Sequence, residues 1–140
     1  MALEWTIDTE LEPAVMFTCD VATGIEKGSL LKLTDPMTVI INSGDIDQCI
    51  GIAAEEKVAN DGKTTIGVYM RGIFICTAGA SITVGDLLMN NASTGAVNEV
   101  IPATAAADGS HVFALSLETA SDTNTLKVLL NAAIGGSVET

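Results

Sequence analysis

The chain has 140 residues, enough for one domain, and its 6 basic and 18 acidic residues give it a net charge of −12. A domain of this size buries about 70% of the surface of its unfolded chain, so it needs neither a metal nor a disulfide for stability. The negative charge argues against nucleic acids and anionic membranes as partners, because both are polyanions.

The chain begins with "MALEWTIDTELEPAV", which has neither the basic region nor the unbroken apolar region of a secretory signal. No later segment approaches the roughly 20 apolar residues that a membrane helix needs. We therefore expect a soluble chain without a secretory signal and without membrane contact.

Residues 1–20 are polar with scattered apolar side chains, and Pro13 interrupts any regular element, so we expect an extended N-terminal arm. The apolar residues of this arm, which we predict to contact another protein chain, are Leu3, Trp5, Ile7 and Leu11. Interfaces favour tryptophan, and the alternating pattern suits pairing with the sheet edge of another chain. Trp5, the sole tryptophan, lies outside the predicted core. The alternative is that it covers one end of its own barrel.

From residue 15 onward the chain contains short segments rich in Val, Ile, Thr and Leu, and each is bounded by turn-forming residues. They predict β-strands at residues 15–19, 29–33, 37–41, 48–55, 64–70, 72–77, 86–90, 96–100, 111–118 and 125–130. The stretches between them are rich in Asn, Asp and Gly, which tolerate the positive φ that tight hairpins need. One window, residues 53–60, favours at most a single helical turn. The pattern predicts an all-β fold, a small compact barrel or sandwich.

The same pattern occurs twice in the sequence. The repeated stretches are "IEKGSLLKL" (25–33) and "ITVGDLLMN" (82–90). In each, a glycine lies three positions after an apolar residue, and a pair of leucines begins two positions after the glycine. Each pattern is followed by an apolar strand ending in glutamate, Glu55 or Glu118, and by a strand with the order apolar, x, Val. The glycine bend should direct the leucine pairs inward, namely Leu30, Leu31, Leu87 and Leu88. We predict two similar three-strand units that cover each other, because a few strands alone leave one face exposed.

Cys19, Cys49 and Cys76 are odd in number, widely spaced and embedded in apolar segments. This pattern is typical of buried free thiols. A zinc site that combines them with His111, the only histidine, is disfavoured because structural zinc sites usually take their cysteines as close pairs. We expect no metal site.

Two other stretches contain residue types that occur in functional sites. Asp108, Ser110 and His111 supply the members of a hydrolase triad, but they crowd into "AADGSHV", where linking two strands is the simplest role. The carboxylates of "NSGDID" (42–47) could hold Ca²⁺ in a receptor- or carbohydrate-binding β module, although their spacing matches no standard calcium loop. We expect no catalytic residues, and we keep the binding module as the alternative function.

The succession "GIEKGSLL", "IGIAAEE", "GVYMRGIF", "ASITVGDLLM", "STGAV" and "ALSLETA" to "TLKVLL" covers roughly residues 21–131. It resembles the small capsid decoration proteins of tailed bacterial and archaeal viruses. In that family a glycine introduces an apolar strand, here Gly72 to Thr77, and a "GD" turn precedes another, here Gly85 and Asp86. The acidity of this chain departs from the family.

The resemblance implies a β domain, residues 21–131, that binds the outer surface of an expanded icosahedral head and joins neighbouring major capsid proteins. It also implies a homotrimer whose N-terminal arm, residues 1–20, reaches the capsid or another subunit. No enzyme activity and no cofactor belong to such a protein, which is made in the host cytoplasm and becomes part of the virion. Residues 132–140 are expected to be a flexible tail, because they combine glycines with a polar end.

Overall fold

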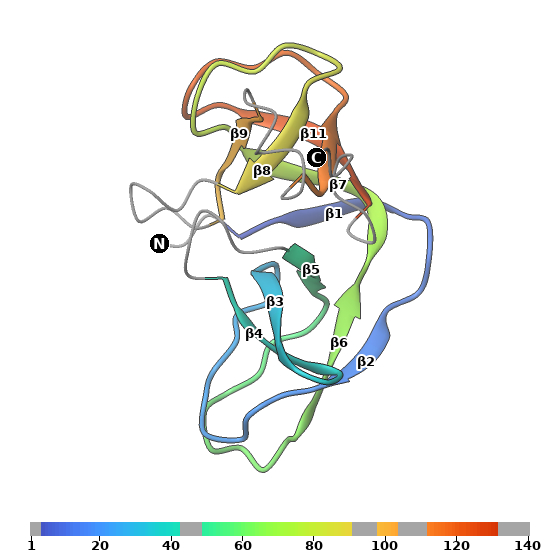
Figure 1. The fold of residues 1–140 in the computed structure, drawn as a ribbon, viewed down its shortest axis with the longest axis vertical. Coiled ribbons are helices and arrows are strands. Elements are labelled where there is room, and N and C mark those ends of the chain that lie inside the picture. Colours follow the sequence, from blue (N-terminus) through green and yellow to red (C-terminus); the bar gives the residue numbers. More distant parts are fainter. Residues whose placement is uncertain (1–3, 43–48, 91–97, 104–111, 132–140) are drawn as a thin grey trace, which may run out of the picture.

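A computed structural model describes residues 4–42, 49–90, 98–103 and 112–131 (Figure 1). These residues form eleven β-strands and no helix, which confirms the predicted all-β fold. The strands are β1 (Thr6–Glu10), β2 (Val15–Thr18), β3 (Leu30–Asp35), β4 (Thr38–Ile41), β5 (Cys49–Ala53), β6 (Thr65–Tyr69), β7 (Arg71–Thr77), β8 (Leu87–Asn90), β9 (Val100–Pro102), β10 (Ala114–Ser116) and β11 (Thr125–Asn131). Within these ranges no helix is available to cross a membrane.

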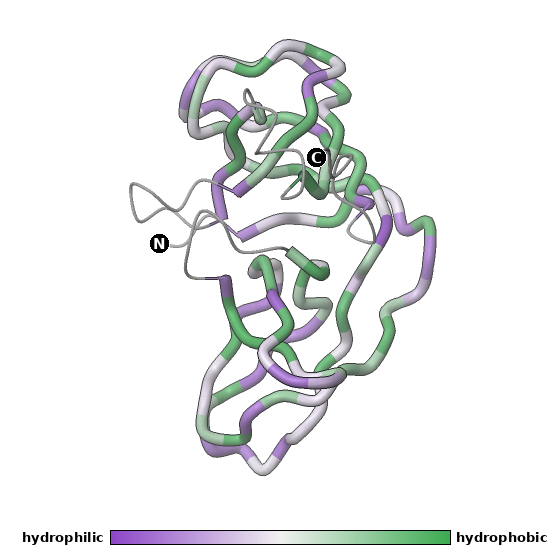
Figure 2. Tube along the Cα trace, viewed as in Figure 1, coloured by the Kyte–Doolittle hydropathy of each residue, from purple (hydrophilic) through white to green (hydrophobic). Residues whose placement is uncertain are grey.

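The strands form two sheets that lie one above the other in Figure 1. Strands β2 to β6 make a closed barrel in the order β2-β4-β3-β5-β6, and the other six make a sheet in the order β1-β7-β11-β10-β8-β9. Strand pairing is antiparallel throughout, except for the parallel pair of β2 and β4 that closes the barrel. Figure 2 shows that the strands of both units are mostly apolar, whereas the turn at the lower tip of the barrel is polar.

The two units have the same strand connectivity, which confirms the predicted repeat. The order β4-β3-β5-β6-β2 in the barrel matches the order β9-β8-β10-β11-β7 in the second sheet, with antiparallel pairing at each corresponding step. The repeated unit therefore has five strands instead of the three that the sequence predicts. The second unit carries one additional strand, β1, at its edge.

The glycine bends of the two units adopt the same geometry. Gly28 and Gly85 have φ angles of 92° and 90°, in the region that favours glycine. The amide of Gly28 donates to Ala53 O and that of Gly85 donates to Ser116 O, both at 2.9 Å. Gly28 is under a second constraint, because a Cβ at this position would lie 2.4 Å from Trp5 O.

Apolar side chains form two clusters. One fills the barrel, and the other lies under the second sheet and extends into the first unit, because it contains Leu30, Cys49 and Ile52 as well as Leu88. The predicted inward position is confirmed for three of the four leucines and is wrong for Leu87, whose surface is 49% exposed. All three cysteines are free and buried, as predicted.

The segment expected to form an N-terminal arm is part of both sheets of its own chain. Strand β1 pairs antiparallel with β7, with Ile7 opposite Phe74, and β2 is a barrel strand. The alternating pattern that favours pairing with a sheet edge is therefore satisfied within the chain, at least over residues 6–10. Between these two strands, the connecting residues 11–14 are exposed.

Candidate docking surface

The structure separates the four residues that the sequence predicts at an interface. Trp5 is only 4% exposed, so its predicted position outside the core is wrong. Ile7 is partly buried against the same cluster, and Leu11 is exposed. Leu3 lies outside the described residues. Of the three described residues, only Leu11 is exposed, at 45%.

Trp5 is buried because it fills the space beneath the second sheet. Its ring centroid lies 5.9 Å from that of Phe74 and 5.7 Å from that of Phe113. Its Nε1 donates to Asn98 O at 2.8 Å, which satisfies the polar end of the indole. Trp5 N also donates to Gly28 O at 2.8 Å, so this residue links the two units.

An apolar row crosses four strands on the outer face of the second sheet. Leu87 is paired with Leu115, Leu115 with Leu129, and Leu129 with Ile73. Their neighbours in sequence, such as Leu88 and Ala114, point into the core, so these four point away from it. We call this set, Ile73, Leu87, Leu115 and Leu129, the leucine row.

Basic residues flank the leucine row. Arg71 and Lys127 are each two positions from a row residue, and therefore lie on the same face of the sheet. Both are exposed, and Lys127 Nζ lies 3.9 Å from Asp8 Oδ2 on the edge strand β1. This face thus combines apolar and basic groups on a chain whose net charge is −12.

A second group of exposed apolar residues belongs to the barrel. Leu33 and Met37 lie in the β3–β4 hairpin, and Met16 lies in β2, on the opposite side of that strand from its buried neighbour Phe17. The hairpin and β2 are in direct contact, because Thr18 N donates to Met37 O at 2.7 Å. We call this set, Met16, Leu33 and Met37, the hairpin patch. Each member is at least 49% exposed, and exposed apolar groups close to one another are typical of binding surfaces.

The family model for phage cement proteins matches residues 11–132. The chain belongs to the phage cement protein family. Its fold is similar to that of the N base of head fiber gp8.5 of bacteriophage phi29, with a TM-score of 0.54 and 20% sequence identity over 91% of this chain and 99% of that chain. No curated protein gives a significant match.

Membership of this family confirms the resemblance found in the sequence. The cement protein is a structural component of the virion, located on the outer surface of the capsid, where it binds the shell and stabilises it. A protein with this role needs a surface that contacts other proteins, and the leucine row and the hairpin patch are two candidates for it.

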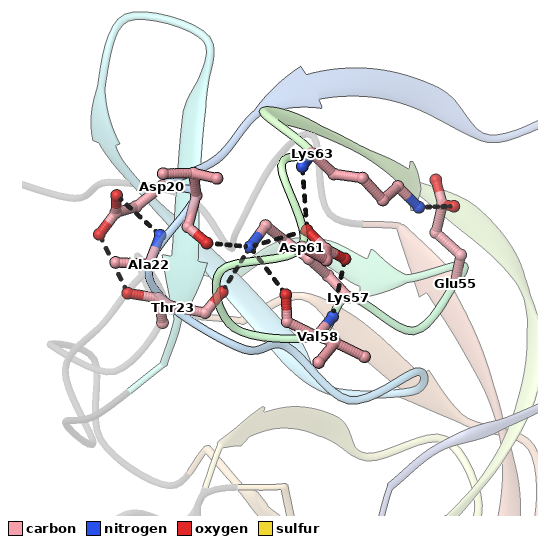
Figure 3. Close-up of polar contacts among 9 residues, drawn as sticks. Asp20, Ala22, Thr23, Glu55, Lys57, Val58, Asp61 and Lys63 are labelled. Carbon is pink, nitrogen blue, oxygen red and sulfur yellow. Dashed lines mark hydrogen bonds and ion pairs between the residues drawn. The ribbon is translucent and has the colours of Figure 1, made fainter.

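A buried lysine fixes one loop of the cement protein's barrel (Figure 3). The side chain of Lys57 has no exposed surface, and its Nζ donates to Val21 O at 2.9 Å and to Thr23 O at 2.8 Å. Asp61 Oδ1 lies 3.8 Å from the same nitrogen. The ammonium group joins the loop at residues 21–23 to the turn that follows Lys57, so its role is structural.

The carboxylates near Lys57 are held in the same way. Glu55 accepts hydrogen bonds from Lys63 Nζ at 2.9 Å and from Gly67 N at 2.8 Å. The bond from Lys63 is the main cause that lowers the pKa of Glu55, and the amide of Gly67 adds to it. The amide of Lys63 is the main cause that lowers the pKa of Asp61. At neutral pH both carboxylates are ionised, and their oxygens accept hydrogen bonds from neighbouring groups of the barrel.

The described residues contain two further kinds of chemical group to consider, the buried thiols and the metal-binding side chains. Burial raises the pKa of the Cys49 thiol to about 12, and burial also raises the pKa of Cys76, so both stay protonated. Within the described ranges no three metal-binding side chains meet. Asp108, Ser110 and His111, for which the sequence favours a linking turn over a triad, and the acidic residues of 43–47 lie outside those ranges.

Proposed function

We propose that the cement protein acts as a homotrimer that joins neighbouring major capsid proteins on the outside of an expanded head. In this proposal the leucine row forms the contact between copies. One observation carries it: Leu87 is 49% exposed, whereas its counterpart in the first unit, Leu30, is completely buried.

The repeat makes these two leucines comparable. Each lies two residues after the glycine bend of its unit, and each is the first residue of its strand, Leu30 of β3 and Leu87 of β8. Leu30 is covered because the second unit packs over that face of the first. An equivalent apolar face on the second unit, left open in the single chain, supports the inference that another copy covers it.

Charge also supports a contact at this face. Each copy carries a net charge of −12, so bringing copies together is opposed by repulsion. Arg71 and Lys127 beside the leucine row would reduce that repulsion at the place where copies meet. The predicted contacts through Leu3, Ile7 and Leu11 remain part of the proposal, and Leu11 has the exposure that such a contact needs.

A trimer relaxes the affinity required of each shell contact. If one copy binds with a micromolar dissociation constant, about −8 kcal/mol, the second and third contacts of a trimer become intramolecular. Avidity then rises roughly 100-fold or more without any new contact. We propose a purely structural role with no catalytic turnover, in which no single side chain has the importance of a catalytic base.

Two measurements test the proposal. Analytical ultracentrifugation of the purified protein should give the mass of a trimer, and Leu87→Ser should shift it to the monomer. Val58→Ser is the matched control, because Val58 is 61% exposed but lies in the first unit. Mixing with expanded, undecorated heads should give saturable, stoichiometric addition. A monomeric wild-type protein would contradict the trimer, and failure to bind heads over a range of salt concentrations would contradict the capsid role.

A further inference from the structure

The turn of the β3–β4 hairpin contains a residue whose backbone conformation is unfavourable for its type. Asp35 and Thr38 are paired, so Pro36 and Met37 form a two-residue connection. Proline fixes φ at about −65° at the first position, and Met37 has a φ of 53° at the second. Proline followed by a residue with positive φ is the arrangement of a type II turn, which favours Gly or Asn at that second position.

Burial of the Met37 side chain does not compensate for this conformation. Met37 is 55% exposed, the largest exposure in the hairpin patch. An L-residue with a left-handed backbone is disfavoured relative to glycine, and methionine lacks the short polar side chain with which Asn or Asp stabilises such a turn. The isolated chain therefore gains little from a methionine here. A strained residue that local stability does not explain is a reason to look for a role in binding.

The surroundings of Met37 extend the apolar surface. Leu33 is 49% exposed in the same hairpin, and Met16 is 53% exposed in β2. The bond from Thr18 N to Met37 O and the pairing of Thr18 with Thr38 fix the turn to β2 at the seam that closes the barrel. The patch is thus held by the sheet, and its two methionines have the flexible, polarizable side chains that adapt to an irregular partner surface.

We propose that the hairpin patch is the surface with which the cement protein contacts the capsid shell, with Met37 inserted into an apolar depression of the shell. This inference rests on the proposed function, in which each copy needs one surface for other copies and another for the shell. The leucine row lies on the second unit and the hairpin patch lies on the first, so both contacts can form at once (Figure 1).

Charge beside the patch specifies the partner further. Asp35 precedes Pro36 in the turn, and Asp20 follows β2 by two residues. Both are exposed. A shell surface that accepts this patch should therefore surround its apolar depression with basic side chains, and binding should weaken as salt concentration rises.

Glycine substitutions separate binding from stability. Met37→Gly relieves the backbone and removes the side chain, so its melting temperature should stay unchanged or rise by up to about 4 °C. Its affinity for expanded heads should fall about tenfold or more. Thr123→Gly is the matched control, because Thr123 is also exposed with a φ of 74° but lies in the second unit, and it should bind like the wild type. Met37→Leu should retain most of the affinity.

The wild-type protein offers a second measurement that needs no variant. Oxidation of Met16 and Met37 by dilute peroxide, followed by mass spectrometry, should be at least several-fold slower on heads than in solution. Met89, which is 6% exposed, should oxidise slowly in both states.

The outcomes distinguish the inference from the proposed function. If the wild type binds heads but Met37→Gly binds equally well, or if both methionines stay reactive on the head, the hairpin patch is not the shell contact. If the wild type does not bind heads at all, both the proposed function and this inference fail.

Discussion

The two units share a repeat but close in different ways. In the first unit, β2 pairs with β6 on one side and with β4 on the other, which completes a barrel. In the second unit, the corresponding strand β7 pairs with β11 and with β1, while β9 reaches it only through the bridge between Ala78 and Val100. The added strand β1 thus takes the position that a barrel strand occupies in the first unit.

This difference explains the core of the molecule. Because β1 holds the second sheet open, its interior has to be filled by other groups, and these are Trp5 and the first unit's Leu30 and Ile52. The first unit instead contains a buried lysine that hydrogen-bonds to a neighbouring loop. This residue, Lys57, occupies the β-bridge position that Ala120 holds in the second unit. One repeated sequence therefore gives a self-contained barrel and a sheet that depends on its neighbour.

The largest effect is expected from Trp5→Ala. The substitution removes the ring that contacts Phe74 and Phe113, together with the Nε1 bond to Asn98 O. We expect a loss of about 3–5 kcal/mol in the free energy of unfolding, measured by urea denaturation. Amide exchange should accelerate more in β7 and β11 than in β3 and β6. Leu11→Ala, at an exposed position, should change the stability by less than about 0.5 kcal/mol, and a similar loss for both variants would contradict the assignment of Trp5 to the core.

The two equivalent leucines provide a direct comparison between the units. Leu30→Ala leaves a cavity where the units meet and should reduce the free energy of unfolding by about 2–5 kcal/mol. Leu87→Ala removes a side chain that is half exposed in the single chain. Measured at concentrations low enough to keep the chain monomeric, its loss should be under about 1 kcal/mol. Equal losses would mean that the two faces are equally covered.

The sequence predicts the repeat well because the repeat depends on local chemistry. A glycine at positive φ, the apolar residue three positions before it and the leucine pair behind it are visible as letters, and Gly28 and Gly85 adopt the expected bend. The strands themselves follow from short apolar segments between turn residues. The existence of β2 to β11 needed no information about packing between units, although β9 begins at Val100, where the predicted strand at 96–100 ends. Strand β1 is not among the predicted strands.

The errors concern contacts between distant segments. Leu30 and Leu87 occupy the same place in the repeated pattern. Leu30 is buried because the second unit packs over it, whereas no part of the described chain covers Leu87 in this way. Trp5 is buried because its segment pairs with β7, about 70 residues away in the chain. The alternating pattern predicts pairing with a sheet edge, but it does not show whether that edge belongs to the same chain or to another. Lys57 reads as an ordinary charged turn residue; comparison with Ala120 in the aligned repeat would have marked it as buried.

Lys57→Met tests how much the hydrogen bonds of the buried lysine stabilise the first unit. Methionine keeps much of the side-chain length but removes the ammonium donor, which leaves the carbonyls of Val21 and Thr23 without this partner. We expect a loss of about 2–3 kcal/mol in the free energy of unfolding and faster amide exchange in the barrel. Lys63→Met, which breaks an exposed ion pair with Glu55, should lose no more than about 1 kcal/mol. A neutral Lys57→Met would indicate that packing alone fixes the loop.

The smallest effect concerns the two glutamates that end corresponding strands. Glu55 Oε2 accepts from Gly67 N at 2.8 Å, and Glu118 Oε1 accepts from Lys127 N at 3.0 Å, but the bond from Lys63 Nζ belongs to Glu55 alone in this pair. These bonds lower the pKa of Glu55 below its ordinary value of 4.5, so the stability they provide is present above that pH and is lost as pH falls through the lower, folded-state pKa.

Glu55→Gln should therefore remove part of the loss of stability that the wild type shows below about pH 4.5. The effect should be well under 1 kcal/mol, because the Glu55 side chain is 39% exposed and solvent screens its ion pair. Melting curves at pH 7 and pH 3.5 measure it, with Glu118→Gln as the matched control in the other unit. The difference between the two pH values should shrink more for Glu55→Gln than for Glu118→Gln, because only the first variant loses an ion pair with a lysine. An equal reduction in both would show that the backbone amides, which the two units share, account for the pH dependence.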